Sequence, residues 1–437
     1  MKKLGLLASA AALCFILTAY NDVGLGVISA SSKSQDSMTD DESVIELSFW
    51  TFGSTNYEEL AQEYMDKYPH IRINIRSTGD LVAHHNQLTA ALAAGSGAPD
   101  IFQLDIGFVA RFIHAEDRFY NLNELGAKRM RGQYLDWVWA EGSSADGSFQ
   151  LGLPADIGPM VVYYRTDLVE QAGLPSDPAS FSEAIHTWDN FAQVARQFKD
   201  QTGQAFVDSW ELIFRAVRDQ ADGEIYYSRA DDSFIGDRNP RVKRAYDLAA
   251  LGIQEGWISG AVPESEAWVQ GLTDGSFAVV PGPAWLLERI KSLAPDTAGL
   301  WRVAQLPEGS VNWGGSFLVL PKQVKYPEEA YAFVEWVASQ EQQAASFREA
   351  GKMPSIPGLY DEPEFQGFQD GFLGGQASAV EFGKAALNIE PVYYGPLHDQ
   401  TDAYIRAALR NVQERAADPD AEWESALEKI RRFVLHD

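Results

Sequence analysis

Aromatic and hydrogen-bonding side chains recur in this chain at points where predicted strands end. Trp50 and Asn56 follow an alternating apolar stretch, Asp105 closes a short apolar run, and Trp285 comes after another apolar strand. Flat rings bury the apolar face of a ligand at small entropic cost, whereas carboxylates and amides hold its polar groups by hydrogen bonds. These residue types indicate non-covalent ligand binding.

The segments around these residues predict a parallel sheet. Ile45–Trp50 alternates as a strand, Thr55–Glu58 reads as a capping box that opens a helix, and Ile71–Arg76 alternates strictly between isoleucine and polar residues. A third short strand, Asp100–Leu104, follows a further helix. This alternation predicts a doubly wound α/β unit, in which ligands bind beyond the carboxyl ends of the strands.

The stretch Leu151–Leu168 is interpreted as a connection between two lobes. An apolar strand runs into Pro154, a break containing Asp156 follows, and a second strand, Met160–Tyr164, is apolar enough to be buried on both faces. An ordinary strand pair within one domain is the alternative. Two later passages, Asn312–Ser316 and the one beginning at Gly351, are also rich in glycine and predict two more crossings.

Composition restricts the class of protein. At 437 residues the chain exceeds one typical core, so two lobes are expected. The formal net charge of -27 argues against nucleic acid or an anionic membrane as partner, because phosphate groups require a basic face. A neutral ligand fits this charge better.

The N-terminus predicts export. Two lysines precede the apolar stretch Leu4–Leu17, so we predict a signal peptide at residues 1–20 and a disordered tether at residues 21–43. Leu17–Tyr20 resembles the lipid-attachment box of bacterial lipoproteins, but Tyr20 stands where that box has cysteine. The only cysteine, Cys14, lies within the signal. We therefore expect a protein at the cell surface or in the periplasm, with a membrane tether left open.

Several segments together carry a family resemblance. In order they are ELSFWTF, ALAAGSGAPDIFQLD, FQLGLPADIGPMVVYYRTDLVEQAGLP, GSFAVVPGPAW, GGSFLVLPK and GKMPSIPG. The ordered set, which extends over roughly Val44 to Phe433, resembles the sugar-binding extracellular solute-binding proteins of ATP-driven (ABC) importers, the family that includes maltose-binding protein.

The resemblance implies two doubly wound α/β lobes joined by three hinge strands. Lobe 1 would comprise residues 44–156 and 316–355, and lobe 2 residues 157–315 and 356–437. It also implies a monomeric binding protein that captures a sugar or short oligosaccharide in the cleft between the lobes and delivers it to a membrane permease.

The resemblance places three aromatic positions in the cleft. Trp285 follows a Gly-Pro element as the stacking aromatic of the family does, although Ala284 intervenes here; Trp210 falls near a second cleft aromatic, and Tyr393 and Tyr394 lie in the loop that holds a third. Asp105 and Asp156 are also read as helix or turn caps. The predicted ligand-binding residues are Trp285, Trp210, Asp105, Asp156, Trp50, Asn56, Trp313, Ser316, Tyr393 and Tyr394.

Two alternatives remain open. A secreted polysaccharide hydrolase would need two carboxylates about 5 to 10 Å apart, and sequence cannot exclude such a pair. However, the chain has no G-x-S-x-G, H-E-x-x-H or phosphate-loop motif, and the adjacent His84 and His85 would lie on different helix faces. The other alternative is the same fold with a non-sugar solute. We predict no enzymatic activity, no cofactor and no metal site.

Overall fold

The computed structural model describes residues 44–53, 55–113, 115–220, 223–395 and 397–435. The predicted signal peptide at residues 1–20, the tether at residues 21–43 and Cys14 lie outside the described residues.

The described strands form one sheet, with the order β2-β1-β3-β8-β4-β6-β5 and with β7 paired to β4. The strands are β1 Ile45–Thr51, β2 Ile71–Ser77, β3 Ile101–Asp105, β4 Gly152–Arg165, β5 Ala205–Val207, β6 Phe277–Pro283, β7 Trp301–Ala304 and β8 Asn312–Val319. β1 pairs in parallel with β2 and β3, and β5 pairs in parallel with β6, whereas β4 and β8 run antiparallel to their neighbours. The predicted strand–helix–strand unit at the start of the chain is confirmed.

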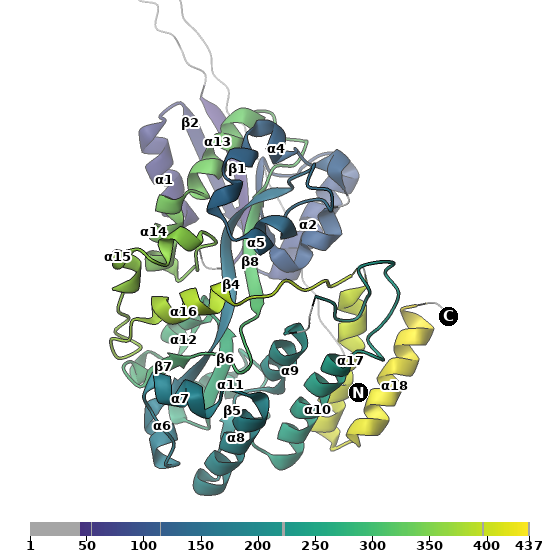
Figure 1. Cartoon of the computed structure of the whole chain (residues 1–437). Helices are drawn as coiled ribbons and strands as arrows, with labels where there is room; N and C mark the ends of the chain where they lie inside the picture. The colour runs from purple at the N-terminus through teal and green to yellow at the C-terminus, as the bar shows by residue number, and fades with distance from the viewer. Residues whose placement is uncertain (1–43, 54, 114, 221–222, 396, 436–437) are drawn as a thin grey trace, which may run out of the picture. The chain divides into compact units, whose positions relative to one another are not determined.

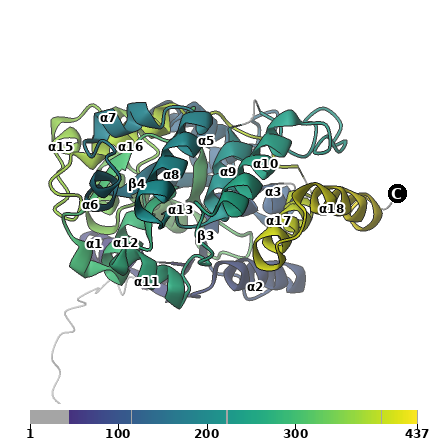
Figure 2. The same ribbon diagram turned by 90° about the horizontal axis from the view of Figure 1, so that it is seen from below.

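Helices cover the sheet around two groups of strands. Beside β1, β2 and β3 lie α1 Tyr57–Lys67, α2 Leu81–Ala94, α3 Val109–Phe112, α4 Leu122–Leu125, α5 Asp136–Glu141, α13 Pro327–Val337 and α14 Gln340–Ala350. The others are α6 Thr166–Gln171, α7 Pro178–Ala184, α8 Trp188–Thr202, α9 Trp210–Asp219, α10 Pro240–Glu255, α11 Glu266–Asp274, α12 Leu286–Leu293, α15 Pro363–Gln366, α16 Ser378–Leu387, α17 His398–Arg415 and α18 Pro419–Phe433. α9 packs beside α10, and α17 beside α18 (Figures 1 and 2).

β4 connects the two groups of strands (Figure 1). Its first half pairs with β8, and its second half pairs with β6 and β7. The prediction of two strands separated by a break is wrong, because β4 is one strand of 14 residues. It absorbs the irregular residues as register shifts between Pro154 and Asp156 and between Ile157 and Pro159.

The second half of β4 is buried on both faces, as its apolar run predicts. Val161 and Tyr163 belong to one hydrophobic cluster, which also fills the region of β1, β3 and β8. Met160, Val162 and Tyr164 belong to a second cluster, which lies under α8, α9 and α10. The alternation of a strand therefore places successive residues in two different clusters.

The start of α1 differs from the prediction. The capping box at Thr55–Glu58 does not form, because α1 begins at Tyr57 and Asn56 occupies the N-cap position without a side-chain capping bond.

Candidate functional site

Two tryptophans from separate elements meet beside the crossing strands. Trp285 follows β6 directly before α12, and Trp313 is the second residue of β8. The Trp285 Nε1–H donates to the Trp313 carbonyl oxygen at 3.2 Å, and the two ring centroids are 5.3 Å apart in an edge-to-face arrangement. Gly314, at φ 78°, lets Trp285 approach, because a Cβ there would lie 3.1 Å from Trp285 Nε1. Both rings remain partly exposed.

These tryptophans line a cavity of about 330 Å³. Its lining residues come mainly from α9, α12, α17 and the segment before α11: Glu211, Leu212, Phe214, Arg215, Arg218, Pro263, Glu264, Trp268, Trp285, Leu286, Trp313, Asp402 and Arg406. The volume lies within the range of small-molecule sites, about 300 to 1,000 Å³. Trp285 and Trp313 are the two predicted ligand residues that line this cavity.

The charges that line this cavity are balanced. Three arginines face three carboxylates, and most of them are engaged with each other. Arg218 is buried, forms two hydrogen bonds to Asp219 at 2.6 and 3.0 Å, and pairs with Asp402; Arg406 pairs with Glu211. The lining therefore offers polar groups without a net formal charge, which suits an uncharged polar ligand.

Arg215 is partly exposed and lies over the ring of Trp313. Its guanidinium carbon lies 5.1 Å from the centre of the Trp313 ring, and its nearest carboxylate oxygen, on Asp219, is 3.8 Å away. Such stacking holds the planar group against the ring and leaves N–H donors for a ligand.

Asp105 ends β3 and does not line the cavity itself. Its carboxylate accepts a hydrogen bond from the Gly107 N–H at 2.8 Å, which is the capping role considered from sequence. Burial raises the pKa of Asp105 to about 7, the Gly107 bond and the Arg215 and Lys352 charges lower it, and the Asp156 charge raises it. Asp105 therefore lies within electrostatic range of Arg215 on α9.

Asp156 and Ser316 lie together at the crossing strands. The Ser316 Oγ–H donates to the Asp156 carboxylate, and Ser316 Oγ accepts a bond from Gln103 Nε2 at 3.2 Å. Both residues are buried and do not line the cavity. Their polar atoms already have partners within the protein.

The structure places three other predicted residues away from this cavity. Trp210 is 4% exposed and packs in the second hydrophobic cluster. Trp50 lies against the Arg76 guanidinium, whose carbon is 5.0 Å from the ring centre. Asn56 is buried and donates to Glu349 at 3.0 Å.

Tyr393 and Tyr394 have different surroundings. Tyr393 donates to Asp232. The Tyr394 ring packs edge-to-face on His398, with centroids 4.5 Å apart. Burial raises the pKa of the Tyr394 hydroxyl, and the charge of Asp219 raises it further. Tyr394 therefore lies near the Arg218–Asp219 pair that borders the cavity, whereas Tyr393 bonds to a separate loop.

Sequence reasoning missed the charged residues of the cavity. Arg215 and Arg218 lie on α9, whose apolar face is predictable, and arginines on such a helix are usually solvated. Asp402, the partner of Arg218, is 184 residues away in the chain, so no local pattern connects the two.

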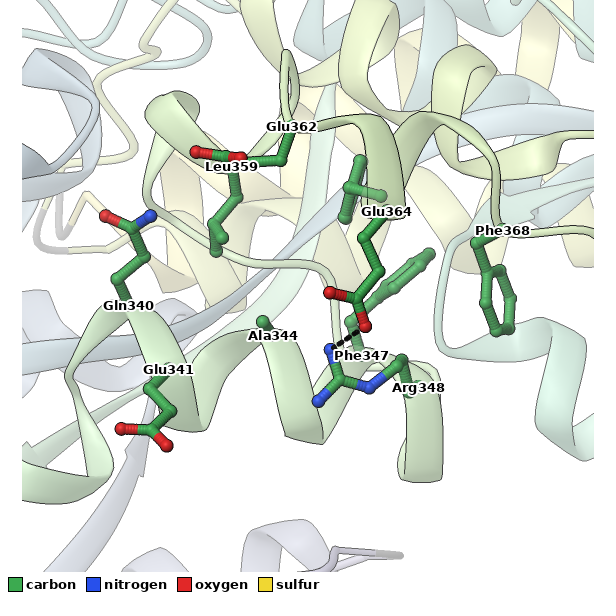
Figure 3. A pocket seen from close by; sticks show the side chains of 10 residues that line it. Gln340, Glu341, Ala344, Phe347, Arg348, Leu359, Glu362, Glu364 and Phe368 are labelled. Carbon is green, nitrogen blue, oxygen red and sulfur yellow. Dashed lines mark ion pairs between the residues drawn. The ribbon is translucent and has the colours of Figure 1, made fainter.

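A second cavity, of about 390 Å³, lies on α14 opposite α15 (Figure 3). Among its lining residues, Phe347 and Phe365 are buried, whereas Glu341, Glu362 and Arg348 are exposed. An ion pair of 3.5 Å joins Arg348 to Glu364 across the opening. None of the predicted ligand residues lines this cavity.

Asp208 lies behind the wall of the first cavity. It is fully buried, its Oδ2 accepts from the Trp268 Nε1–H at 2.8 Å, and its Oδ1 has no hydrogen-bond partner. Burial raises the pKa of Asp208 to about 7, against bonds from Trp268 and the Ser209 backbone that lower it. Between about pH 4 and pH 7, the Asp208 carboxyl is therefore protonated in the folded protein and ionised in the unfolded chain.

We expect this proton to make stability depend on pH. Because the folded-state pKa of Asp208 is raised, the free energy of unfolding should fall as pH rises from about 4 to about 7, by on the order of 4 kcal/mol. Asp208→Asn, which keeps an acceptor for Trp268, should reduce this fall. Urea unfolding at pH 4.5, 6 and 7.5 measures it, and equal pH profiles for wild type and variant would contradict the assignment.

Among the described residues, no group of three or more histidine, cysteine, aspartate or glutamate side chains is arranged to hold a metal ion. Over the same parts of the chain, no helix combines the length and apolar character required to cross a membrane.

The sheet is mixed, and its long strands join two groups of elements next to an aromatic cavity. This arrangement defines a two-lobe ligand-binding protein. A family model described as bacterial extracellular solute-binding protein matches residues 59–370, and the chain belongs to this family. A crystal structure described as extracellular solute-binding protein family 1 superposes with a TM-score of 0.82 at 30% identity, covering 89% of this chain and 99% of that one.

Curated relatives extend over most of the chain. An arabinooligosaccharide-binding protein of Halalkalibacterium halodurans is 25% identical over 75% of this chain and 75% of the relative. A lactose-binding protein of Rhizobium radiobacter is 25% identical over 83% of this chain and 87% of the relative.

Proposed function

We propose that the protein is the solute-binding component of an ABC importer and that it captures a sugar or short oligosaccharide in the cavity beside α9 and α12. The paired rings of Trp285 and Trp313, set among balanced charges, carry this proposal. The relatives named for binding arabino-oligosaccharides and lactose support the choice of a carbohydrate.

The cavity lining matches the chemistry of a pyranose ring. Such a ring has an apolar face of C–H bonds, which a tryptophan can cover, and a fringe of hydroxyl groups, which charged side chains can hold. Arg215 and Asp105 are the proposed hydrogen-bonding groups, with Tyr394 beside them. Each hydrogen bond to a charged group contributes about 1.5 to 3 kcal/mol to binding. A few such bonds together with stacking give a binding free energy of about -8 kcal/mol, which corresponds to a micromolar dissociation constant.

The proposed lobes keep the boundaries expected from sequence, with residues 44–156 and 316–355 in lobe 1 and residues 157–315 and 356–437 in lobe 2. The three segments at these boundaries lie side by side in the structure, which supports this division. A sugar favours closure only by touching both lobes. Trp285 and Arg215 would then act from lobe 2, and Asp105 from lobe 1.

The proposed setting is outside the cytoplasm, at the cell surface or in the periplasm, with delivery to a membrane permease. The family and the export signal expected at residues 1–20 support this setting. We propose a monomer with no catalytic activity and no nucleic-acid partner, in keeping with relatives named as binding proteins and with the net charge of -27.

A thermal-shift screen tests the proposed function. The panel contains arabino-oligosaccharides, lactose, maltose and maltooligosaccharides, with spermidine and glycerol phosphate as non-sugar solutes. A sugar present at a hundred times its dissociation constant adds about 2.7 kcal/mol to the free energy of unfolding and raises the melting temperature. Chromatography of the same samples should recover the sugar intact. Stabilisation by the non-sugar solutes alone, or cleavage of the sugar, would contradict the proposal.

A further inference from the structure

Three chain segments that connect the proposed lobes meet at a single point. Asp156 on β4 pairs with Ser316 on β8, and the next residue, Ile157, bridges to Met353 in the segment after α14. The Ile157 N–H donates to the Met353 carbonyl oxygen at 2.9 Å. A rotation of one lobe against the other must pass through these three neighbouring segments.

The backbones at this point approach each other closely. A Cβ atom added at Gly315, where φ is +103°, would lie 2.6 Å from the Asp156 carbonyl oxygen, and one added at Gly158 would lie 1.9 Å from the Trp313 carbonyl oxygen. Glycine is therefore required at both positions. Such close packing leaves little free space, so small changes in the side chains here shift the segments relative to each other.

The Asp156 carboxylate touches both other segments. One oxygen accepts a hydrogen bond from Ser316 Oγ, and the other lies 3.5 Å from the ammonium nitrogen of Lys352. The side chains of Asp156 and Lys352 are 3% and 10% exposed. Because a charge buried in this way is costly without its partner, removing either member leaves the other uncompensated.

We propose that Asp156 is a positioning residue for lobe closure: its bonds to Ser316 and Lys352 hold the three connecting segments in one arrangement and so limit how far the lobes separate without ligand. The same group is also linked to β3. Gln103 donates to Ser316, and Asp105, two residues later, lies within electrostatic range of Arg215 on α9.

Spin labels on the two lobes test this inference in the ligand-free protein. The exposed Glu59 on α1 and Asp200 on α8 are replaced by cysteine, and Cys14 by serine. Pulsed electron paramagnetic resonance should give a narrow distance distribution for the otherwise unchanged chain and a distribution at least twice as wide for Asp156→Asn and for Lys352→Met. In the double variant, which lacks the same bond as each single variant, the distribution should be no wider than in the single variants.

Equal widths in all four proteins, or a double variant whose widening is the sum of the two single widenings, would overturn the inference. If a charge-removing variant does not fold, Ser316→Ala decides the question, because it removes the bond to Asp156, together with the bond from Gln103, and leaves the Asp156–Lys352 pair in place. An unchanged width there would also overturn the inference. The inference rests on the proposed two-lobe motion but not on any sugar. Failure of the sugar screen would leave these distances interpretable.

A second readout separates positioning from direct ligand contact. Asp156→Asn should weaken binding of arabinotriose and of lactose by the same factor, at least fivefold, because a looser hinge populates the binding-competent arrangement less. A change in the ratio of the two dissociation constants would show that Asp156 contacts the ligand instead.

Discussion

Replacing Trp285 by alanine is expected to lower sugar affinity at least tenfold and to leave the melting temperature of the ligand-free protein nearly unchanged. The ring is partly exposed, and it lines the cavity directly, so its loss removes a stacking surface from the ligand more than it removes packing from the core. Tenfold corresponds to about 1.4 kcal/mol, and aromatic residues at the centre of a binding site often contribute more. Isothermal calorimetry with the tightest sugar of the screen measures the effect.

Trp336→Ala is the matched control. Trp336 is also partly exposed, but it lies away from the cavity. The centroid of its ring is 5.2 Å from that of Tyr64 and 6.1 Å from that of Phe333. This variant should lower the melting temperature and keep the affinity. An unaltered dissociation constant in Trp285→Ala would remove Trp285 from the site, and an equal loss of affinity in both variants would point to general destabilisation.

Local patterns were sufficient to predict the beginning of the fold. The alternation of Ile71–Arg76 and the apolar face of the preceding helix each identify one element, and their order predicts the parallel pair β1 and β2. β4 was harder to predict because proline and glycine ordinarily interrupt strands. In the structure the register shifts next to Pro154 and Pro159 accommodate residues that lack an N–H donor, so the strand continues.

The candidate site was predictable only in part. Trp285 follows a strand and a Gly-Pro element, a local signal that sequence contains, and it lines the cavity. Trp210 was placed in the cleft only by the family resemblance, and in the structure it is buried in the second hydrophobic cluster. No local sequence pattern identifies Arg215, because its proposed role depends on its position over Trp313, about a hundred residues later in the chain.

Replacing Arg218 by methionine is expected to destabilise the protein by about 3 to 5 kcal/mol, because it leaves the buried Asp402 without its ion-pair partner and Asp219 with only the more distant Arg215. Burial alone would lower the pKa of the Arg218 guanidinium, but these two carboxylates raise it well above its usual value. Burial alone would raise the pKa of Asp402, but the Arg218 charge lowers it overall. Urea unfolding at pH 7 measures the loss.

The pH dependence distinguishes this pair from a surface ion pair. Because the folded-state pKa of Asp402 is depressed, the stability it contributes is present above about pH 4 and is lost as pH falls. The difference between wild type and Arg218→Met should therefore shrink between pH 7 and pH 3. Arg196→Met breaks an exposed pair with Glu255, which is worth at most about 1 kcal/mol, and serves as the control. If Arg218→Met lowered the free energy of unfolding no more than this control does, the prediction would be wrong. The buried pair would then contribute as little stability as a surface ion pair.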